Sequence, residues 1–197
     1  MDPLMIDVPH RLATERLILR CPQPGDGPLL NAAQTETLAE LQPWMPWAQA
    51  APSAEESEAY CRRSFARFVL REDLVWFIAE AADERAFVGS VGLHRMDWSL
   101  RRFEIGYWRR TGRGGRGLMT EAVQALTRLA FDTLSAQRVE IRMDDDNTAS
   151  WQLAERAGYT HEAVLRGDGV SPLGQRRSTR VYARVRGIEE PIASIVD

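Results

Sequence analysis

The residues best suited to chemistry in this chain of 197 residues lie in one stretch, positions 103–121. Four glycines fall between positions 112 and 117, and Arg113 and Arg116 lie among them. Glycine lets the backbone come close to a ligand, free backbone N–H groups favour an anion, and the two arginines add positive charge. The stretch therefore predicts a site for a ligand that carries phosphate.

The glycine loop must be positioned by a strand before it and a helix after it. Phe103, Ile105 and Tyr107 alternate with other residues, as in a strand that buries one face. Beyond the loop, apolar residues recur at helical spacing from Leu118 to Ala130. A helix that begins where the glycines end directs the positive end of its dipole at the loop, which strengthens the prediction of an anion site.

Other glycine-rich motifs fit this loop poorly. A P-loop has lysine after its last glycine, where this chain has Leu118. Gly112, Gly114 and Gly117 match G-x-G-x-x-G, but a dinucleotide-binding motif should directly follow a continuously apolar parallel strand. The acidic residue expected about 20 residues later is also missing, since Asp144 lies too far along. An RNA-binding segment rich in Arg and Gly would be repetitive, whereas here a periodic helix follows at once.

The bulk composition indicates one soluble globular domain. The net charge of -3 argues against a general nucleic-acid-binding protein. Cys21 and Cys61 fit a reducing compartment and lie in no metal-ligand spacing. No apolar run approaches the roughly 20 residues of a membrane helix, and no apolar signal core lies near the first residue. We expect a cytoplasmic protein that needs no metal and binds neither nucleic acid nor membrane.

The order of elements predicts an α+β fold. The strand, helix and strand over 102–143 require a parallel crossover, whereas the short loops elsewhere require antiparallel pairs. The prediction is a mixed, mostly antiparallel central sheet of about seven strands with helices on both faces, in one domain over residues 1–187 followed by a tail at 188–197. Strands are expected near 14–20, 74–80, 86–94, 102–108, 138–143, 159–165 and 178–185, and helices near 27–42, 53–71, 118–130 and 150–157.

A second unusual segment is Pro-Trp-Met-Pro-Trp at positions 43–47. Two prolines fix its backbone, and its large apolar side chains would be costly to leave in water. It is a lid packed on the core, one wall of a substrate pocket, or both, since the two roles are compatible. Trp44, Met45 and Trp47 are therefore candidate substrate-binding residues.

Several blocks of the sequence resemble one known family. Residues 115–117 resemble the end of the acyl-CoA-binding motif [QR]-x-x-G-x-[GA] of the GNAT N-acetyltransferases, although Gly112 stands where Gln or Arg is usual. Over residues 11–186, further blocks resemble the RimJ/RimL branch, which acetylates protein N-termini. In chain order these blocks are residues 14–20, 44–47, 104–108, 117–122, 147–150 and 157–159, followed by Glu162.

The resemblance implies the splayed GNAT fold and direct transfer of an acetyl group from acetyl-CoA to an amine. The pyrophosphate would rest on the amides at the start of the helix, and the pantetheine arm would pair with the backbone at positions 107–109. A backbone N–H there would polarise the thioester carbonyl. The implied cofactor-binding residues are Tyr107, Trp108, Arg109, Arg113, Gly114, Gly115, Arg116, Gly117, Leu118, Met119, Thr120, Asn147, Ser150 and Trp151.

Three side chains are candidates for taking the proton of the amine. Glu104 comes first, because carboxylates at this strand position act as bases in other GNAT enzymes. Glu162 is similar in position to a carboxylate proposed for the RimL type, and His94 is the third candidate. Glu104 and His94 are also candidate substrate contacts. Each has a structural alternative: an ion pair for Glu104, a solvated position for Glu162 and a packing role for His94.

Ser150 is the candidate hydrogen-bond donor to the leaving sulfur. Its alternative role is in the capping of a helix by Asn147. The acceptor itself stays open, because fold and acyl donor do not determine it. A protein N-terminus is the expectation from the branch, in a monomer or a homodimer. Small amines, amino acids, or a non-catalytic CoA-binding role are the alternatives.

Overall fold

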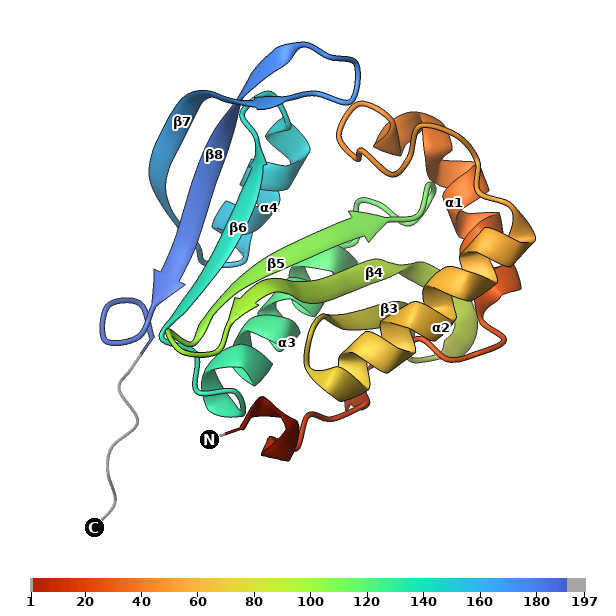
Figure 1. Ribbon diagram of the computed structural model, residues 1–197, viewed down its shortest axis with the longest axis horizontal. Coiled ribbons are helices and arrows are strands. Elements are labelled where there is room, and N and C mark those ends of the chain that lie inside the picture. The colour runs from red at the N-terminus through yellow and green to blue at the C-terminus, as the bar shows by residue number, and fades with distance from the viewer. Residues whose placement is uncertain (1, 191–197) are drawn as a thin grey trace.

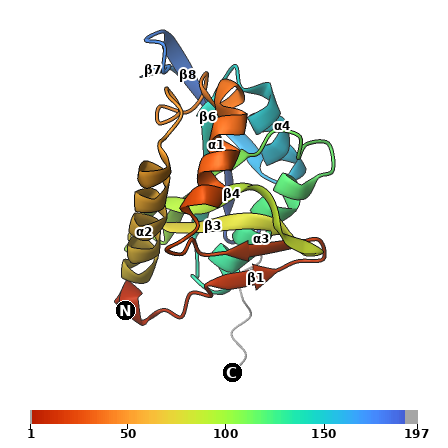
Figure 2. The same ribbon diagram turned by 90° about the vertical axis from the view of Figure 1, so that its right-hand side faces the viewer.

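An eight-stranded sheet separates two layers of helices in the computed structural model, which describes residues 2–190 (Figures 1 and 2). The strand order is β1-β2-β3-β4-β5-β6-β8-β7, and among the described strands only β5 and β6 pair in parallel. The predicted mixed, mostly antiparallel sheet is thereby confirmed. The strands are β1 (Arg11–Ala13), β2 (Leu17–Arg20), β3 (Leu74–Glu80), β4 (Asp83–Asp97), β5 (Arg102–Arg109), β6 (Arg138–Asp144), β7 (Thr160–Val170) and β8 (Arg176–Val185).

Four α-helices cover the two faces of the sheet (Figure 2). Helices α1 (Gly27–Leu41) and α2 (Ala54–Leu70) lie on one face, and α3 (Leu118–Asp132) and α4 (Thr148–Arg156) lie on the other. The start of α2 follows from its sequence, because Ser53 and Glu56 form a capping box in which each side chain accepts the other's backbone N–H. The helices expected from periodicity are therefore all present.

The ends of the sheet differ from the expectation. The additional strand β1 has three residues and pairs with β2, and a run this short leaves no readable alternation. Strand β7 extends into the loop expected at 167–175 as far as Val170, because Gly169 and Val170 still pair with Arg177 and Arg176 of β8. The first residues of the predicted tail fold back on β8, where Glu190 pairs with Arg184 at 2.5 Å. Residues 191–197 of that tail lie outside the described residues.

Strands β5 and β6 separate after a short pairing. Only Arg102, Phe103 and Glu104 of β5 have Cα partners on β6, at positions 138–140, within the part of the chain that the structure describes. Beyond them, β5 stays with β4 as far as Arg109, and β6 stays with β8 (Figure 1). The backbone of β5 from Tyr107 onward therefore lies on an open strand edge inside the molecule, as the predicted splay requires.

The two large side chains at this open edge point to opposite faces of the sheet, as alternation along a strand requires. Tyr107 packs against the main core, where Phe103 and Ile105 are buried together with residues of α3. Trp108 packs against a smaller core beneath α1 and α2, which includes Leu30. Strand β5 thus presents one aromatic side chain to each helical layer.

Candidate active site

Two cavities meet at the open edge of β5. The loop cavity, of about 820 Å³, lies among the glycine loop, the N-terminal turn of α3, α4 and the C-terminal half of α1. The α2 cavity, of about 700 Å³, lies among α1, α2, β4 and β5. Both have the size of a typical small-molecule site, about 300–1,000 Å³. Met45, Tyr107 and Trp108 line both, so a ligand in one cavity can reach a ligand in the other.

The glycine loop is shaped for an anion. Gly115 and Gly117 have φ of +78° and +72°, in the left-handed region that favours glycine, and Gly117 is the N-cap of α3. Both glycines line the loop cavity together with Leu118, Met119 and Thr120 of the first helical turn. The backbone N–H groups of a first helical turn have no partner within the helix, so this end of the cavity favours negative charge.

Ion pairs and hydrogen bonds hold the loop at both ends. At its start, Arg110 pairs with Glu36 of α1 at 2.5 Å, and the backbone N–H of Thr111 donates to Thr37 Oγ1 at 3.0 Å. Beyond the loop, the Glu121 carboxylate accepts from Thr14 Oγ1 at 2.6 Å. The anion site is therefore in place before a ligand arrives, which lowers the entropy lost on binding.

Arginines supply the positive charge of the loop cavity. Arg109, Arg113 and Arg156 line it, opposed by Glu40. A Cβ atom built on Gly114 would lie 1.7 Å from Nη1 of Arg109, so the absence of a side chain at Gly114 lets this guanidinium pack against the loop. A pyrophosphate and a further phosphate would find both amides and cations here.

One carboxylate holds two arginines of the loop. Arg113 and Arg116 both pair with Glu80 at the end of β3, at 2.9 and 2.6 Å. The hydrogen bond from Arg116 lowers the pKa of Glu80, so this carboxylate is ionised near neutral pH. Arg116, a predicted cofactor contact, does not line either of the two cavities formed by the described residues, because its guanidinium is turned to Glu80.

We expect Glu80→Gln to tighten acetyl-CoA binding a few-fold at low ionic strength, because both guanidinium groups then become available to phosphate. The gain should shrink at high ionic strength, where exposed charges are screened. Titration calorimetry at two salt concentrations measures both effects. Glu84→Gln is the matched control, because Glu84 pairs with Arg11 at 2.7 Å. Weaker binding of acetyl-CoA by Glu80→Gln would contradict the idea that Glu80 and phosphate compete for the two arginines. It would show that Glu80 positions the arginines for the ligand.

A pair of hydroxyl groups lies on the α4 side of the loop cavity. Tyr107 Oη lies 3.0 Å from Ser150 Oγ and also donates to the Ser150 carbonyl at 3.1 Å. Burial raises the pKa of Tyr107 to about 12, so its hydroxyl stays protonated near neutral pH. Asn147 Oδ1 accepts from the Ser150 backbone N–H at 3.2 Å, which leaves the serine hydroxyl available. This arrangement can donate a hydrogen bond to an atom in the cavity.

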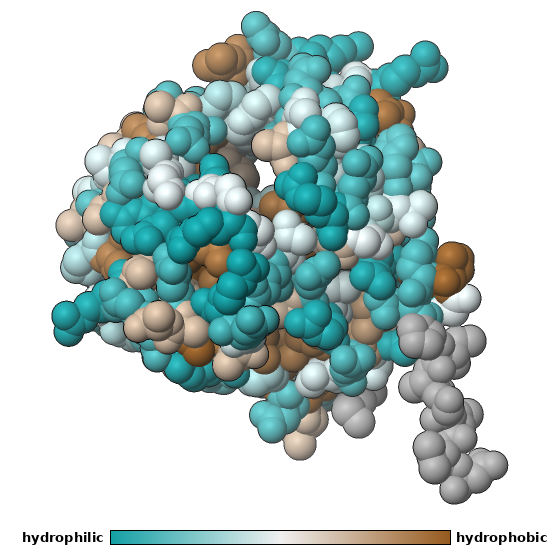
Figure 3. Space-filling view, turned by 180° about the vertical axis from the view of Figure 1, so that it is seen from behind, coloured by the Kyte–Doolittle hydropathy of each residue, from teal (hydrophilic) through white to brown (hydrophobic). Residues whose placement is uncertain are grey.

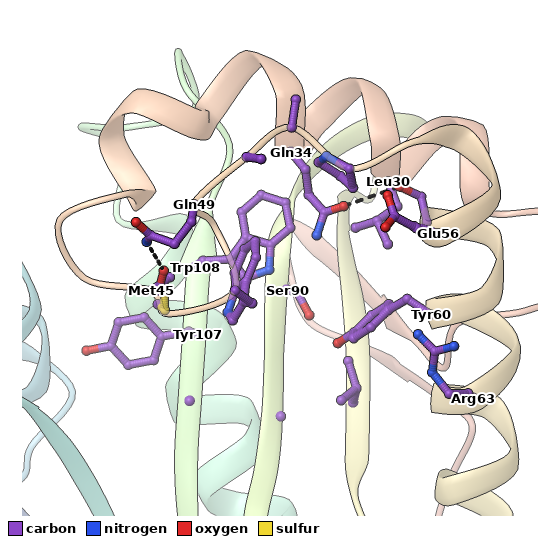
Figure 4. A pocket seen from close by; sticks show the side chains of 18 of the residues that line it. Leu30, Gln34, Met45, Gln49, Glu56, Tyr60, Arg63, Ser90, Tyr107 and Trp108 are labelled. Atoms are coloured by element: carbon purple, nitrogen blue, oxygen red, sulfur yellow. Dashed lines mark hydrogen bonds between the residues drawn. The ribbon is translucent and has the colours of Figure 1, made fainter. Parts of the chain in front are cut away.

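The α2 cavity is lined mainly by apolar and aromatic side chains. In Figure 4, Tyr60 and Arg63 reach in from α2, Trp108 from β5, and Met45 from the loop before α2. Trp47 also lines the cavity and meets Trp108 edge to face, with ring centroids 6.1 Å apart. The 43–47 segment therefore forms part of the wall of both cavities. Trp47 lines the α2 cavity, Trp44 lines the loop cavity, and Met45 lines both.

The predicted site residues fall into two groups. The loop residues other than Arg116, the β5 residues 107–109, Asn147 and Ser150 come together around the loop cavity, whereas His94 and Trp47 line the α2 cavity. Besides Arg116, three predicted residues line neither cavity in the described structure: Glu104, Glu162 and Trp151.

Each of these three residues has another partner. Glu104 pairs with Arg95 at 2.8 Å, and Trp151 lies beneath the guanidinium of Arg180, 5.0 Å from its ring centre. Glu162 forms a two-armed ion pair with Arg138, which lowers its pKa.

Sequence reasoning missed several lining residues. Glu40 comes from α1, Tyr60 and Arg63 from α2, and Arg156 from α4. Each lies far along the chain from the glycine loop, on a helix whose other face is buried. No local pattern distinguishes such residues from ordinary surface positions.

A sheet that opens between two parallel strands, with an anion site at the start of the helix that joins them, defines an acyl-CoA-dependent acyltransferase. A family model described as "Acetyltransferase (GNAT) domain" matches residues 16–160, and the chain belongs to the GNAT acetyltransferases. It is therefore an N-acetyltransferase, and acetyl-CoA is the acyl donor of this family. The predicted family and cofactor are thereby confirmed, and the loop cavity fits this donor through its amides and arginines.

Individual relatives agree with this assignment. A Bacillus subtilis (strain 168) protein named "Putative ribosomal N-acetyltransferase YdaF" is 27% identical over 176 residues, which cover 87% of this chain and 92% of that protein. Two solved structures share the fold with a TM-score of 0.81 and 22% identity, and each alignment covers 88% of this chain. They are the ribosomal L7/L12 alpha-N-protein acetyltransferase RimL with coenzyme A (96% of that chain) and the microcin C7 self-immunity acetyltransferase MccE with acetyl-CoA and AMP (94%).

Seen from behind, the molecule is largely hydrophilic and is hollowed in its upper half (Figure 3). No helix within residues 2–190 combines the length and the apolar character needed to cross a membrane.

Proposed function

We propose that this enzyme acetylates the α-amine at the N-terminus of a protein or peptide. The observation that carries the proposal is the meeting of the two cavities at Tyr107 and Trp108. The loop cavity takes acetyl-CoA, and the α2 cavity has room for the first residues of a peptide. The names of YdaF and RimL, which both refer to ribosomal acetylation, support this class of acceptor.

The order of events follows from this geometry. Acetyl-CoA binds with its phosphates at the start of α3 and its thioester beside the open edge of β5. The amine enters from the α2 cavity and attacks the thioester carbon. A C–N bond forms, the C–S bond breaks, the amine loses one proton, and the CoA thiolate leaves beside Ser150 and Tyr107.

An α-amine suits this site better than a lysine side chain. Free α-amines titrate near pH 8 and lysines near 10.4, so far more of an α-amine is unprotonated at neutral pH. The walls formed by Trp47, Tyr60 and Trp108 favour an apolar or aromatic residue close to the amine. Arg63 lines the same cavity and would favour an acidic side chain further along the peptide. We propose a cytoplasmic location, where such N-termini are made.

We expect CoA release with peptides that have a free N-terminus, and none with the same peptides blocked at the N-terminus but carrying an internal lysine. Thiol release and mass spectrometry of the product measure this directly. Release with small amines or amino acids alone would contradict the peptide proposal and would assign a small-molecule acceptor. Binding of acetyl-CoA without release for any amine would indicate a non-catalytic CoA-binding protein.

A further inference from the structure

A histidine and an aspartate form a pair in the wall of the α2 cavity. His94 Nδ1 lies 2.6 Å from Asp73 Oδ1, within hydrogen-bonding distance. Asp73 directly precedes β3, and His94 lies on β4 opposite Glu104 of β5. Both side chains are only partly exposed, at 35% and 24%. The pair is therefore sheltered, and it is still open to a ligand because His94 lines the cavity.

Two glycines make the space for this imidazole. Gly92 of β4 and Gly106 of β5 are partners across the two strands. A Cβ atom built on Gly92 would lie 2.8 Å from Nε2 of His94, and one built on Gly106 would lie 2.8 Å from its Cδ2. The ring thus lies flat over the glycine pair, where any side chain would displace it. Because both glycines also line the α2 cavity, this end of the ring is in the acceptor's space.

The pair fixes which ring nitrogen is free. With Nδ1–H donating to the Asp73 carboxylate, the neutral ring has its lone pair on Nε2. The carboxylate also stabilises the imidazolium that forms when Nε2 takes a proton, as in other histidine–carboxylate pairs. Nε2 lies over Gly92 and Gly106, which line the α2 cavity, and Gly106 directly precedes Tyr107, where the two cavities meet.

We propose that His94 is the base that takes the proton of the acceptor amine, and that Asp73 is the residue that positions it. As the amine nitrogen bonds to the acetyl carbon, one of its protons moves to Nε2. The C–S electron pair leaves on sulfur, and the imidazolium later returns its proton to solvent. The inference rests on the proposed function only in placing the amine in the α2 cavity, and it holds for any amine that binds there.

Other charged groups around the ring do not replace it. Glu104 lies across from His94, but its carboxylate is paired with Arg95 and lines neither cavity in the described structure. Tyr60 and Arg63 approach from α2, and Arg63 is a permanent cation that cannot accept a proton. Glu56 of α2 also lines the cavity, but the Ser53 backbone N–H donates to its carboxylate at 2.7 Å and lowers its pKa, so it is a weaker base than an imidazole. Among the described groups of this wall, His94 is therefore the one suited to take the proton.

The test compares four variants on whichever amine the wild-type enzyme acetylates. We expect His94→Gln to lower kcat/KM for the amine about 100- to 1,000-fold near neutral pH, a typical contribution of a positioned base. The deficit should shrink at high pH, because hydroxide can then take the proton that the attacking amine loses in place of the imidazole. Affinity for acetyl-CoA should not change. His161→Gln is the matched control and should behave as wild type, because His161 packs on Tyr182 at 5.2 Å, away from both cavities.

Asp73→Asn should give a smaller loss with the same dependence on pH, because the ring keeps its place but loses the charge that supports its cationic form. A deficit in His94→Gln that is constant across pH, or no deficit, would overturn the proposal. If His94→Gln gave either of these results and Glu104→Gln showed a pH-dependent loss, the base would be Glu104. The comparison can use any amine that the enzyme acetylates. The proposal for His94 can therefore be tested even if the enzyme does not acetylate peptides.

Nitrogen NMR of the imidazole provides a measurement that needs no acceptor. We expect neutral His94 to have its proton on Nδ1 in the wild-type enzyme, and to shift toward the Nε2–H form in Asp73→Asn. An Nε2–H form in the wild type would leave no lone pair facing the cavity and would overturn the assignment.

Discussion

Gly117→Val is expected to weaken acetyl-CoA binding by at least about 100-fold, a loss of about 3 kcal/mol. Gly117 is the N-cap of α3, has φ of +72°, and lines the loop cavity. The nearest protein atom to a Cβ built on it would be Arg16 Nη2, at 3.8 Å. The added Cβ atom would thus be in ordinary contact only with the Arg16 guanidinium, and the valine side chain would take the space that a phosphate needs to reach the amides of the first turn.

The strain of the substitution must be separated from this loss of space. A β-branched residue in the left-handed region costs about 1–3 kcal/mol of stability wherever it lies. Gly112→Val is the matched control, since Gly112 has φ of +74°, has no atom within 4 Å of its Cβ position, and lines neither cavity of the described structure. Both variants should melt earlier by a similar amount, but only Gly117→Val should lose CoA affinity in calorimetry. Equal affinity losses would show that strain in the loop, and not blocked approach, controls binding.

The cofactor half of the site could be predicted from sequence because it is local. The glycine loop, the N-terminal turn of α3 and the β5 edge are consecutive in the chain, so one stretch of alternation, glycines and helical spacing specifies all of them. Asn147 and Ser150 were candidates through resemblance, and both line the loop cavity, where the Ser150 hydroxyl contacts Tyr107. Arg116 shows the limit of this reasoning, because its partner Glu80 comes from a strand more than 30 positions earlier.

The acceptor half could not be predicted, because distant elements form it. His94 was a candidate on its own, but its partner Asp73 lies in the turn before β3 and has no sequence signal. The role of Gly92 and Gly106 depends on strand register, which places them side by side. The ion pairs of Glu104 with Arg95 and of Glu162 with Arg138 are also set by neighbouring strands. Position along a strand therefore predicted carboxylates near the site, but not which group faces the cavity.

The other large effect concerns the departure of CoA. We expect Ser150→Ala to lower kcat about 10- to 100-fold while acetyl-CoA affinity stays within a few-fold. Removing one donor to an oxyanion costs about 100- to 1,000-fold, and a thiolate, whose conjugate acid has a pKa near 8.5, needs less help. Alanine at this position keeps the backbone N–H that Asn147 caps, so the variant removes only the hydroxyl.

Tyr107→Phe distinguishes a single donor from a connected pair. Tyr107 Oη contacts both the hydroxyl and the carbonyl of Ser150, so its loss should free the serine hydroxyl to turn away. If the hydroxyl groups of Tyr107 and Ser150 act together, the Tyr107→Phe/Ser150→Ala double variant should be little slower than Ser150→Ala alone. Removing either hydroxyl breaks the same hydrogen bond between them. Multiplied losses in the double variant would instead show two independent donors. Ser99→Ala is the serine control, because its hydroxyl bonds Asp97 in the turn before β5.

The pH dependence of the wild type completes this test. Burial disfavours the phenolate and raises the pKa of Tyr107 to about 12, so the protonated donor is present below that value and is lost only above it. We therefore expect kcat to show no decline through the range near pH 10 where an ordinary tyrosine titrates. Single-turnover rates measured with saturating acetyl-CoA isolate the chemical step. A fall in wild-type kcat with an apparent pKa near 10 that is absent from Tyr107→Phe would show that this hydroxyl is exposed to solvent in the complex, and the leaving thiolate would then depend on Ser150 alone.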